Sequence, residues 1–324
     1  LETIMIQVYC SGNIVADVQA KTLTQLPPTD EVAIVEEIAL ILGGNAANAA
    51  AVLARMGVNT AVIGRIGADY FGRFAQDALA EAGVDTSLMV TDPAEKTAAT
   101  VAAIDSAGKR RCAHVPAATA NFTAQDFDWT RIQLDLADRQ SDTPIFLHFS
   151  SFFLLPGFDG LSTAAVLQRA QTLGLRTSLD VCWDPAGRWA ADLLPCLPHC
   201  DLILPNETEA RAITGVTEPR AMAQWFLDRG VKTVVVKLGA DGCLVKNSEL
   251  EVHIPGFAVQ AVDATGAGDA FAGGFLAGLV WGWDWERAAR FACALAALSV
   301  TDFGVATALQ SKEQVLVLMD RNGH

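Results

Sequence analysis

The chain has 324 residues, a formal net charge of −14 and an apolar content of 51%. Proteins that bind nucleic acid or anionic membranes usually carry a basic stripe, but adjacent basic residues occur here only around Arg110 and Arg111. Neither partner is therefore expected, whereas the apolar content is sufficient for a large buried core.

The predicted elements of the N-terminal part mix strands with two helices. Apolar runs bounded by turn residues indicate strands at 4–12, 15–23, 31–40, 60–67, 97–104 and 110–115. The stretches 45–57 and 70–83 each end on a glycine, which is typical of helices. The turn-forming residues between the last two strands indicate a hairpin.

From about residue 144 the elements alternate regularly. Strands are predicted at 144–150, 176–182, 201–205 and 232–239, and helices at 161–174, 207–215, 219–230, 269–282 and 285–300. This alternation is typical of a mostly parallel sheet covered by helices on both faces. The strands near 15–42 and 97–115 do not fit it, so we expect them to form a small separate sheet inserted at the edge of a single domain over residues 1–324.

One apolar stretch, 270–283, requires a test for a membrane span. It lies between Asp269 and Asp284 and is shorter than the ~20 residues needed to cross a bilayer, so a buried helix is predicted. The start of the chain lacks a basic region followed by a long apolar run, so no signal peptide is expected. We expect a cytoplasmic protein.

Polar or glycine-rich segments follow several of the predicted strands, at 12–17, 43–48, 206–209, 237–242 and 263–269. In an open parallel sheet, ligands bind where the carboxyl ends of the strands meet. We therefore expect these five segments to converge on one ligand site.

The segment DATGAGDAF, residues 263–271, carries the strongest chemical signal. The backbone amides of Gly266, Ala267 and Gly268 precede a predicted helix, and bare amides at a helix N-terminus bind anions such as a phosphoryl group. Asp269 would stand beside that group and accept a proton from an attacking hydroxyl. Because a helix N-terminus favours the anionic form, Asp269 is expected to be a weak base. The alternative is that Asp269 only caps the helix.

Two further segments supply polar side chains. Gly43, Gly44, Asn45 and Asn48 precede the helix at 45–57, and asparagine both donates and accepts hydrogen bonds, which suits a polyol. Asp17, which follows the first strand, can accept two hydroxyl hydrogen bonds. The alternative is turn chemistry with a helix cap.

Asn206 and Glu209 are spaced one helical turn apart, a spacing that suits phosphate or metal-bound water, or else a solvated first turn. The chain contains neither G-x-x-x-x-G-K-[ST] nor G-x-G-x-x-G after its first strand, so a P-loop enzyme is excluded and a dinucleotide-binding enzyme is disfavoured.

With these segments in the same order, the chain resembles the ribokinase-like (PfkB) family of carbohydrate kinases over nearly its whole length. GGNAANAAAVLARMG (43–57) is similar to the family's N-terminal signature, and IGRIGADYFG (63–72) to its G-x-x-G-x-D-x-x-G stretch. NETE (206–209) matches N-x-x-E, and DATGAGDAFAGGF (263–275) matches the C-terminal signature. The resemblance implies a three-layer α/β sandwich with a small β-sheet lid and phosphoryl transfer from ATP to a sugar hydroxyl.

The resemblance also implies roles for individual residues. Asp269 would be the catalytic base, and the amides of Gly266, Ala267 and Gly268 the anion hole. Asp17, Gly43, Gly44, Asn45 and Asn48 match the sugar-binding positions, whereas Asn206, Glu209, Lys237, Gly239 and Gly242 match the nucleotide site, with Glu209 holding Mg²⁺ through water. Asp263 and Thr265 match positions that hold a monovalent cation in potassium-activated members, and Gly304 falls in the neighbouring loop.

The chain departs from the ribokinase pattern at two places. Asn45 stands where ribokinases have a lysine, and His148, Ser150 and Ser151 lie where ribose-specific members have a glutamate, so ribose is not implied as the acceptor. The stretch 180–189 resembles the D-P-N-x-R segment of fructokinase and ketodeoxygluconate kinase relatives, with Asp180 or Asp184 as the matching aspartate and Arg188 as a candidate site residue.

The sequence thus predicts an ATP- and Mg²⁺-dependent sugar kinase, activated by K⁺ and dimeric through its lid. The nearer alternative is a nucleoside kinase of the same family, for which Phe149, Phe152 and Phe153 offer aromatic rings. The distant alternatives are a Rossmann-type oxidoreductase and a sugar-binding protein without catalysis.

Overall fold

The computed structural model describes residues 5–23, 25, 27–105, 110–137, 143–302 and 311–321. Its main element is an eight-stranded sheet in the order β14-β13-β12-β11-β10-β9-β1-β4, in which the strands from β12 to β4 run parallel. These strands are β1 (Val8–Ser11), β4 (Thr60–Ile63), β9 (Phe146–Phe149), β10 (Arg176–Leu179), β11 (Leu202–Ile203), β12 (Thr233–Lys237), β13 (Cys243–Asn247) and β14 (Glu251–Ile254). The antiparallel hairpin β13–β14 at the edge was not predicted.

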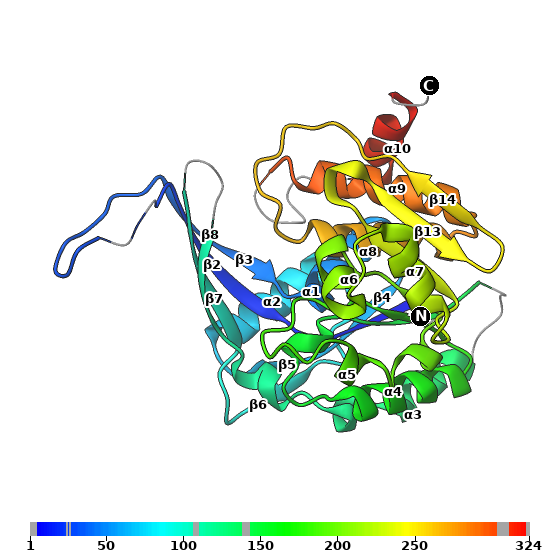
Figure 1. Ribbon diagram of the computed structural model, residues 1–324. Helices are drawn as coiled ribbons and strands as arrows, with labels where there is room; N and C mark the ends of the chain where they lie inside the picture. The colour runs from blue at the N-terminus through cyan, green and yellow to red at the C-terminus, as the bar shows by residue number, and fades with distance from the viewer. Residues whose placement is uncertain are drawn as a thin grey trace.

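Helices cover both faces of this sheet (Figure 1). One buried apolar cluster contains residues of α1 (Asn45–Arg55), α2 (Tyr70–Glu81), α8 (Ala267–Val280), α9 (Trp285–Ser299) and α10 (Lys312–Arg321). The cluster on the other face contains residues of α3 (Trp129–Ala137), α4 (Gly160–Thr172), α5 (Ala190–Leu193), α6 (Glu207–Thr214) and α7 (Pro219–Leu227). The predicted three-layer sandwich is therefore confirmed.

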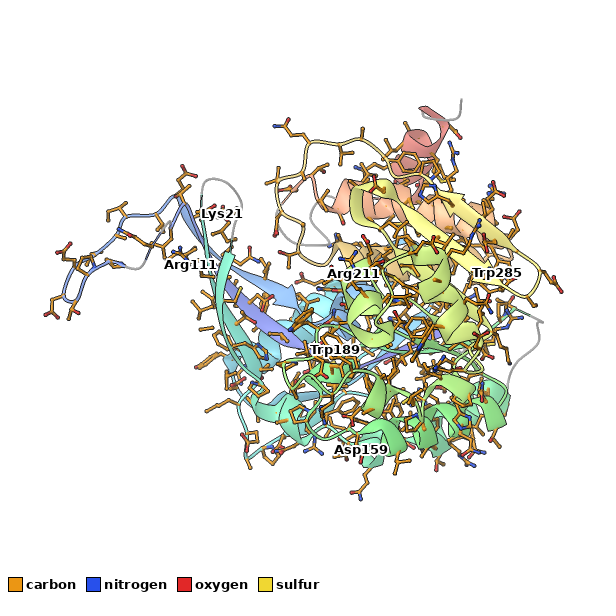
Figure 2. All side chains as sticks on the ribbon, viewed as in Figure 1. Lys21, Arg111, Asp159, Trp189, Arg211 and Trp285 are labelled. Carbon is orange, nitrogen blue, oxygen red and sulfur yellow. The ribbon has the colours of Figure 1, made fainter. Side chains whose placement is uncertain are left out.

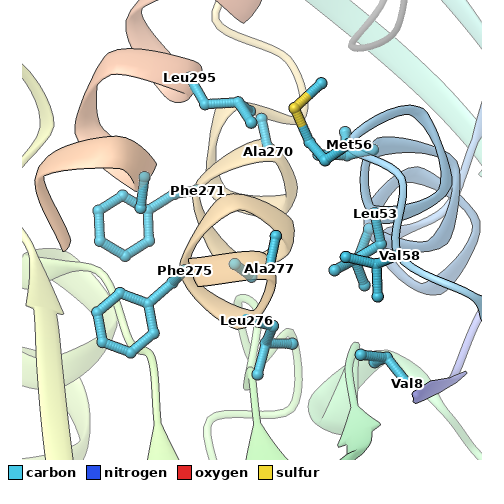
Figure 3. Close-up of a cluster of buried hydrophobic side chains, with 14 of the residues drawn as sticks. Val8, Leu53, Met56, Val58, Ala270, Phe271, Phe275, Leu276, Ala277 and Leu295 are labelled. Atoms are coloured by element: carbon cyan, nitrogen blue, oxygen red, sulfur yellow. The ribbon is translucent and has the colours of Figure 1, made fainter. Parts of the chain in front are cut away.

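Helix α8 lies in the middle of the first cluster, between α1 and α9 (Figure 3). Every residue from Asp269 to Val280 is buried. Neighbouring helices come so close that a Cβ atom built at Gly273 would lie 2.8 Å from Val52 Cγ1, and one at Gly278 would lie 2.8 Å from Ala288 Cβ. The apolar stretch 270–283 thus forms a core helix, and among the residues that the structure describes no helix is long and apolar enough to cross a membrane.

A separate four-stranded sheet, the lid, projects from one side of the sandwich (Figure 1). Its strands, in the order β3-β2-β7-β8, are β2 (Val15–Lys21), β3 (Glu37–Gly43), β7 (Ala98–Ile104) and β8 (Arg110–Val115). The strand predicted at 31–40 is wrong in its first half, because residues 31–36 pair with no strand and extend into solvent, with Ile34 93% exposed. The short strands β5 (Arg65–Gly67) and β6 (Val90–Asp92) form a two-stranded sheet.

Candidate active site

The carboxyl ends of β10, β11 and β12 meet the first turn of α8. Asn206, at the start of α6, forms an isolated parallel bridge with Lys237 at the end of β12. A Cβ atom built at Gly268 would lie 3.3 Å from Lys237 Nζ. The predicted nucleotide residues and the glycine segment therefore lie side by side.

Asp269 occupies the first turn of α8 but does not cap it. The N-cap residue is Gly266, in the left-handed conformation with φ of 69°, and it makes no side-chain cap hydrogen bond. The carboxylate of Asp269 instead accepts hydrogen bonds from Asn45 Nδ2 at 2.7 Å and Asn48 Nδ2 at 2.8 Å. The prediction that Asp269 is only a cap is wrong, and the two asparagines of α1 hold the carboxylate in place.

Burial makes Asp269 a stronger base than the helix terminus alone would suggest. The side chain is 5% exposed, and loss of hydration raises its pKa to about 7. The nearby Asp180 carboxylate also raises the pKa, while the amides of Asn48 and Asn45 and the Lys237 ammonium lower it. The sequence led us to expect a weak base, whereas burial shifts this pKa upward.

Lys237 and Asp180 form a buried ion pair beside the glycine segment. Lys237 Nζ lies 2.7 Å from Asp180 Oδ2, and the two side chains are 11% and 6% exposed. Burial would lower the pKa of Lys237, but the carboxylates of Asp180 and Glu209 outweigh it and raise that pKa. A permanently charged ammonium therefore stands next to the amides that would hold a phosphoryl group.

Asn206 and Glu209 form a reciprocal capping box at the start of α6. Asn206 Oδ1 accepts from the Glu209 N–H at 2.9 Å, and Glu209 Oε2 accepts from the Asn206 N–H at 2.8 Å. The Glu209 side chain itself is shielded from solvent, since it is 7% exposed, and this burial raises its pKa. The box thus fixes a buried carboxylate near Lys237, where it can hold water on Mg²⁺.

The sequence did not indicate Asn13 as a site residue, although it lies in the segment 12–17. Asn13 Oδ1 accepts from the Asn45 N–H at 2.6 Å, and the Ser151 hydroxyl lies 2.6 Å from Asn13 Oδ1 and 3.0 Å from Asn45 Oδ1. His148 is instead buried within the sheet with Nδ1 3.0 Å from Ser178 Oγ. Of the three candidates His148, Ser150 and Ser151, Ser151 is therefore the one with a hydrogen bond to Asn45.

Asp17 on β2 lies against the glycine pair that precedes α1. A Cβ atom built at Gly43 would lie 2.2 Å from Asp17 Oδ2, and Gly44 has φ of 91°, which favours glycine. These glycines let the Asp17 carboxylate of the lid approach the start of α1, which begins at Asn45. We call six residues the acceptor set, meaning the candidate binding residues for a phosphoryl acceptor: Asn13, Asp17, Asn45, Asn48, Ser151 and Asp269.

The loop after β10 answers the choice between Asp180 and Asp184. Asp180 pairs with Lys237 in the site, whereas the Asp184 carboxylate accepts hydrogen bonds from backbone N–H groups of its own loop, including those of Ala186 and Trp189. Arg188 pairs with Asp192 on the surface at 2.7 Å. The structure therefore places Asp180, not Asp184 or Arg188, among the site residues.

Residues Ser151, Cys182 and Trp189 share an unusual feature, since all three have positive φ values of 62°, 63° and 40° without being glycine. Such strained residues cluster at functional sites. They lie in the loops after β9 and β10, which are joined by the Phe153 N–H to Val181 O hydrogen bond at 3.1 Å. These two loops are thus joined next to Ser151 of the acceptor set.

Asp263 and Thr265 lie just before the glycine segment. Asp263 Oδ1 accepts from the Thr265 N–H at 2.9 Å and from the Thr265 hydroxyl. Asp263 Oδ2 is buried and has no hydrogen-bond partner among the residues that the structure describes. An unpartnered buried carboxylate oxygen fits a monovalent cation; Gly304, predicted in the neighbouring loop, lies outside the described residues.

The remaining predicted residues lie in the turn between β12 and β13 or in the core. Gly239 and Gly242 have φ of 61° and 90°, and a Cβ atom at Gly242 would lie 2.0 Å from Ile254 O, so this turn requires glycine. Phe149, Phe152 and Phe153 are all buried in the core. They do not supply the open aromatic wall that a nucleoside acceptor would favour.

Comparisons with known proteins show the family to which the chain belongs. A profile described as pfkB family carbohydrate kinase matches residues 5–312. The chain is 32% identical over 286 residues to a ribokinase of Haemophilus influenzae, covering 86% of this chain and 87% of the relative. It is 30% identical over 326 residues to a fructokinase of Vibrio alginolyticus, covering 96% and 98%.

The fold comparison gives the same result. A structure of Arabidopsis thaliana ribokinase complexed with ribose and ATP is similar to this chain with a TM-score of 0.82 at 25% identity. The similarity covers 98% of this chain and 99% of the other. The ribokinase-like fold predicted from the sequence is confirmed.

Proposed function

Because the chain belongs to the pfkB family of carbohydrate kinases, we propose that it transfers the γ-phosphoryl group of ATP to a sugar hydroxyl, acting as one kinase domain over residues 1–324. The observation that carries the proposal is the buried Asp269 carboxylate, held by Asn45 and Asn48 in the first turn of α8, directly after the glycine segment. A base and an anion site thus lie within one turn of α8.

The proposed mechanism assigns a separate task to each group. The acceptor hydroxyl gives its proton to Asp269 as its oxygen attacks the γ-phosphorus and the bond to ADP breaks. The amides of Gly266 to Gly268 and the Lys237 ammonium stabilise the charge on the transferred group. Glu209 would hold the water of Mg²⁺, which neutralises phosphate charge when it is bound.

The test is ADP release by the purified chain with ATP, Mg²⁺ and a panel of ketoses, aldoses, sugar acids and nucleosides. We expect sugar-dependent ADP release and none with adenosine or inosine. Turnover of a nucleoside with no turnover of any sugar would contradict the proposal.

The pKa of Asp269 predicts how activity depends on pH. Only the deprotonated carboxylate accepts a proton, and burial raises the pKa to about 7, so kcat/KM for the acceptor should rise with pH through about 7 and then level off. Asp180 also raises this pKa, so Asp180→Asn should move the rise to lower pH. A pH profile with its rise near the ordinary aspartate pKa in the parent protein would disagree with this prediction.

Activation by K⁺ is proposed from the unpartnered Asp263 Oδ2. A cation there would neutralise a buried charge three residues before Gly266, so we expect turnover to be severalfold higher in potassium than in tetramethylammonium chloride. Because a bound ion stabilises the folded state by mass action, the melting temperature should rise too. Equal rates and equal melting temperatures in potassium, sodium and tetramethylammonium would remove the cation site.

Homodimerisation through the lid is proposed from its outer face. Ile38, Leu40, Val101 and Val115 are 68%, 40%, 57% and 51% exposed, and the strand register places them on the face opposite Asp17. A four-stranded sheet with an open apolar face needs a partner, which we propose is a second copy. Light scattering should give twice the monomer mass, and Val101→Glu should give the monomer; a fully active monomeric parent would contradict this.

A further inference from the structure

Within the proposed sugar-kinase function, we infer that the acceptor is an uncharged polyhydroxy sugar and that acceptors bearing a carboxylate or a phosphate are rejected, an inference that rests on that function and narrows its substrate class. Two independent features carry it. They are the balance of hydrogen-bond donors and acceptors in the acceptor set, and the charges around it.

The orientation of the Asn45 amide is fixed by Asp269. Its Nδ2 group donates to Asp269 Oδ1 at 2.7 Å, and the opposite orientation would place two oxygens in contact. The Asn45 amide oxygen must therefore point away from Asp269, and it lies 3.0 Å from the Ser151 hydroxyl.

That hydroxyl cannot satisfy both oxygens that it contacts. Ser151 carries one proton but lies 2.6 Å from Asn13 Oδ1 and 3.0 Å from Asn45 Oδ1. Asn13 Oδ1 is the closer of the two oxygens, and Ser151 and Asn13 are 0% and 6% exposed. When Ser151 donates to Asn13, the Asn45 oxygen retains its acceptor capacity.

The acceptor set therefore presents more oxygen acceptors than protons. Besides the Asn45 oxygen, each Asp269 oxygen accepts one amide N–H and keeps a further lone pair, and Asp17 adds another carboxylate. A sugar hydroxyl supplies the proton that each of these oxygens needs. A carboxylate or phosphate group at neutral pH could accept the second N–H of the Asn45 and Asn48 amides, but it supplies no proton to the oxygens of Asp17, Asn45 and Asp269, which would leave oxygens facing each other.

The charges around the acceptor set also disfavour an anionic acceptor. Asp17 and Asp269 bring negative charge to the acceptor set, and the basic side chains on the neighbouring described segments are already engaged by carboxylates. Lys237 pairs with Asp180, Arg65 with Asp92 and Asp126, and Arg188 with Asp192, while Lys96 lies beside Asp69.

The lid residues level with Asp17 in the strand register, Ile41, Thr100 and His114, include no permanent cation. His114 lies level with Asp17 in the strand register, and partial loss of hydration lowers its pKa more than the Asp17 carboxylate raises it. Lys21 lies at the outer end of the lid and pairs with Glu37 (Figure 2). Arg111 is in register with Ala103 and hence faces away from Asp17. An anionic acceptor would thus meet like charge without a compensating partner.

The test compares acceptors that share a skeleton but differ in charge. Fructose is paired with fructose 1-phosphate and fructose 6-phosphate, ribose with ribose 1-phosphate, and glucitol with gluconate, so that a free hydroxyl remains in each anion. We expect kcat/KM for the best neutral acceptor to exceed that of each of its anionic counterparts by about 100-fold or more, because uncompensated like charge costs several kcal/mol.

Two variants locate this discrimination at the acceptor set. Asn45→Lys introduces a cation beside Asp269, and Asn45→Met matches its length without the charge. Both should turn over more slowly than the parent, since the Asn45 amide is lost. The ratio of kcat/KM for a neutral acceptor to kcat/KM for its anionic counterpart should, however, be at least tenfold lower in Asn45→Lys than in Asn45→Met. Thermal shifts with each acceptor in the presence of a non-hydrolysable ATP analogue report binding where turnover is slow.

The outcomes distinguish failure of this inference from failure of the sugar-kinase function on which it rests. An anionic acceptor used within tenfold of its neutral partner overturns the inference and leaves the sugar kinase standing. The same result follows if the two Asn45 variants show equal preference. If no sugar in either series supports ADP release or shifts the melting temperature, the sugar-kinase function itself fails.

Discussion

Replacing Asp269 with asparagine is expected to lower turnover by about 10²–10⁴-fold, the usual effect of removing a general base. The substitution keeps the side-chain size and costs one of the two hydrogen bonds from Asn45 and Asn48, so the free energy of unfolding should change by only about 1 kcal/mol. ATP binding should persist, because the amides of Gly266 to Gly268 and the ammonium of Lys237 are untouched. Turnover, a melting curve and ATP titration measure the three quantities.

Asp159 provides the matched control. It also stands at the start of a helix, but its carboxylate accepts from the Ser162 N–H at 2.7 Å as a true N-cap of α4, and Figure 2 shows it at the far side of the sandwich from the lid tip. Asp159→Asn retains a capping oxygen and should leave turnover unchanged. If the two asparagine variants have equal, near-parent turnover, the assignment of Asp269 as the base fails.

Substituting Lys237 with methionine should reduce kcat/KM for ATP by about 10²–10³-fold, the effect of removing one preorganised donor from an anion site. It should also destabilise the fold by about 3–5 kcal/mol, because Asp180 becomes an unpaired buried charge. Both effects follow from the 2.7 Å ion pair between the two side chains. Turnover and thermal melting are measured on the same protein.

The double variant Lys237→Met with Asp180→Asn separates the two effects. Without the buried charge, its melting temperature should return towards that of the parent, while its kcat/KM for ATP should stay low. Recovery of both quantities together would mean that the pair has only a structural role, and that Lys237 does not act on the phosphates.

The sequence indicated the base and the anion site because their signal is local. Gly266 to Asp269 are contiguous, and a glycine segment before an apolar helix is typical of backbone amides that bind an anion. The partners of Asp269 were named, but as sugar ligands, because nothing in GGNAAN shows that two of its amides turn towards a residue 221 to 224 positions away. Only the packing of α1 against α8 brings them together.

Other features depend on burial or on long-range pairing, which a single sequence does not contain. Asp180 and Asp184 are equivalent in the pattern, and the choice between them is made by Lys237, 57 residues from Asp180. The direction in which the pKa of Asp269 shifts is set by the burial of its side chain, which the position of the residue in the helix does not reveal. Residues 31–36 have the composition of a strand but no neighbour to pair with.

Helix α8 begins with the proposed base and anion hole and continues as a helix buried from Asp269 to Val280, where neighbouring side chains leave no room for a Cβ atom at positions 273 and 278. The amide protons of its buried part, from Ala270 to Val280, should exchange with solvent only when the whole sandwich opens, whereas the lid strands, with one face exposed, should open locally. Heat inactivation should therefore follow global unfolding with no earlier loss of the catalytic turn. We therefore expect slow hydrogen exchange in the buried part of α8, which follows the proposed catalytic residues, and fast exchange in the lid strands.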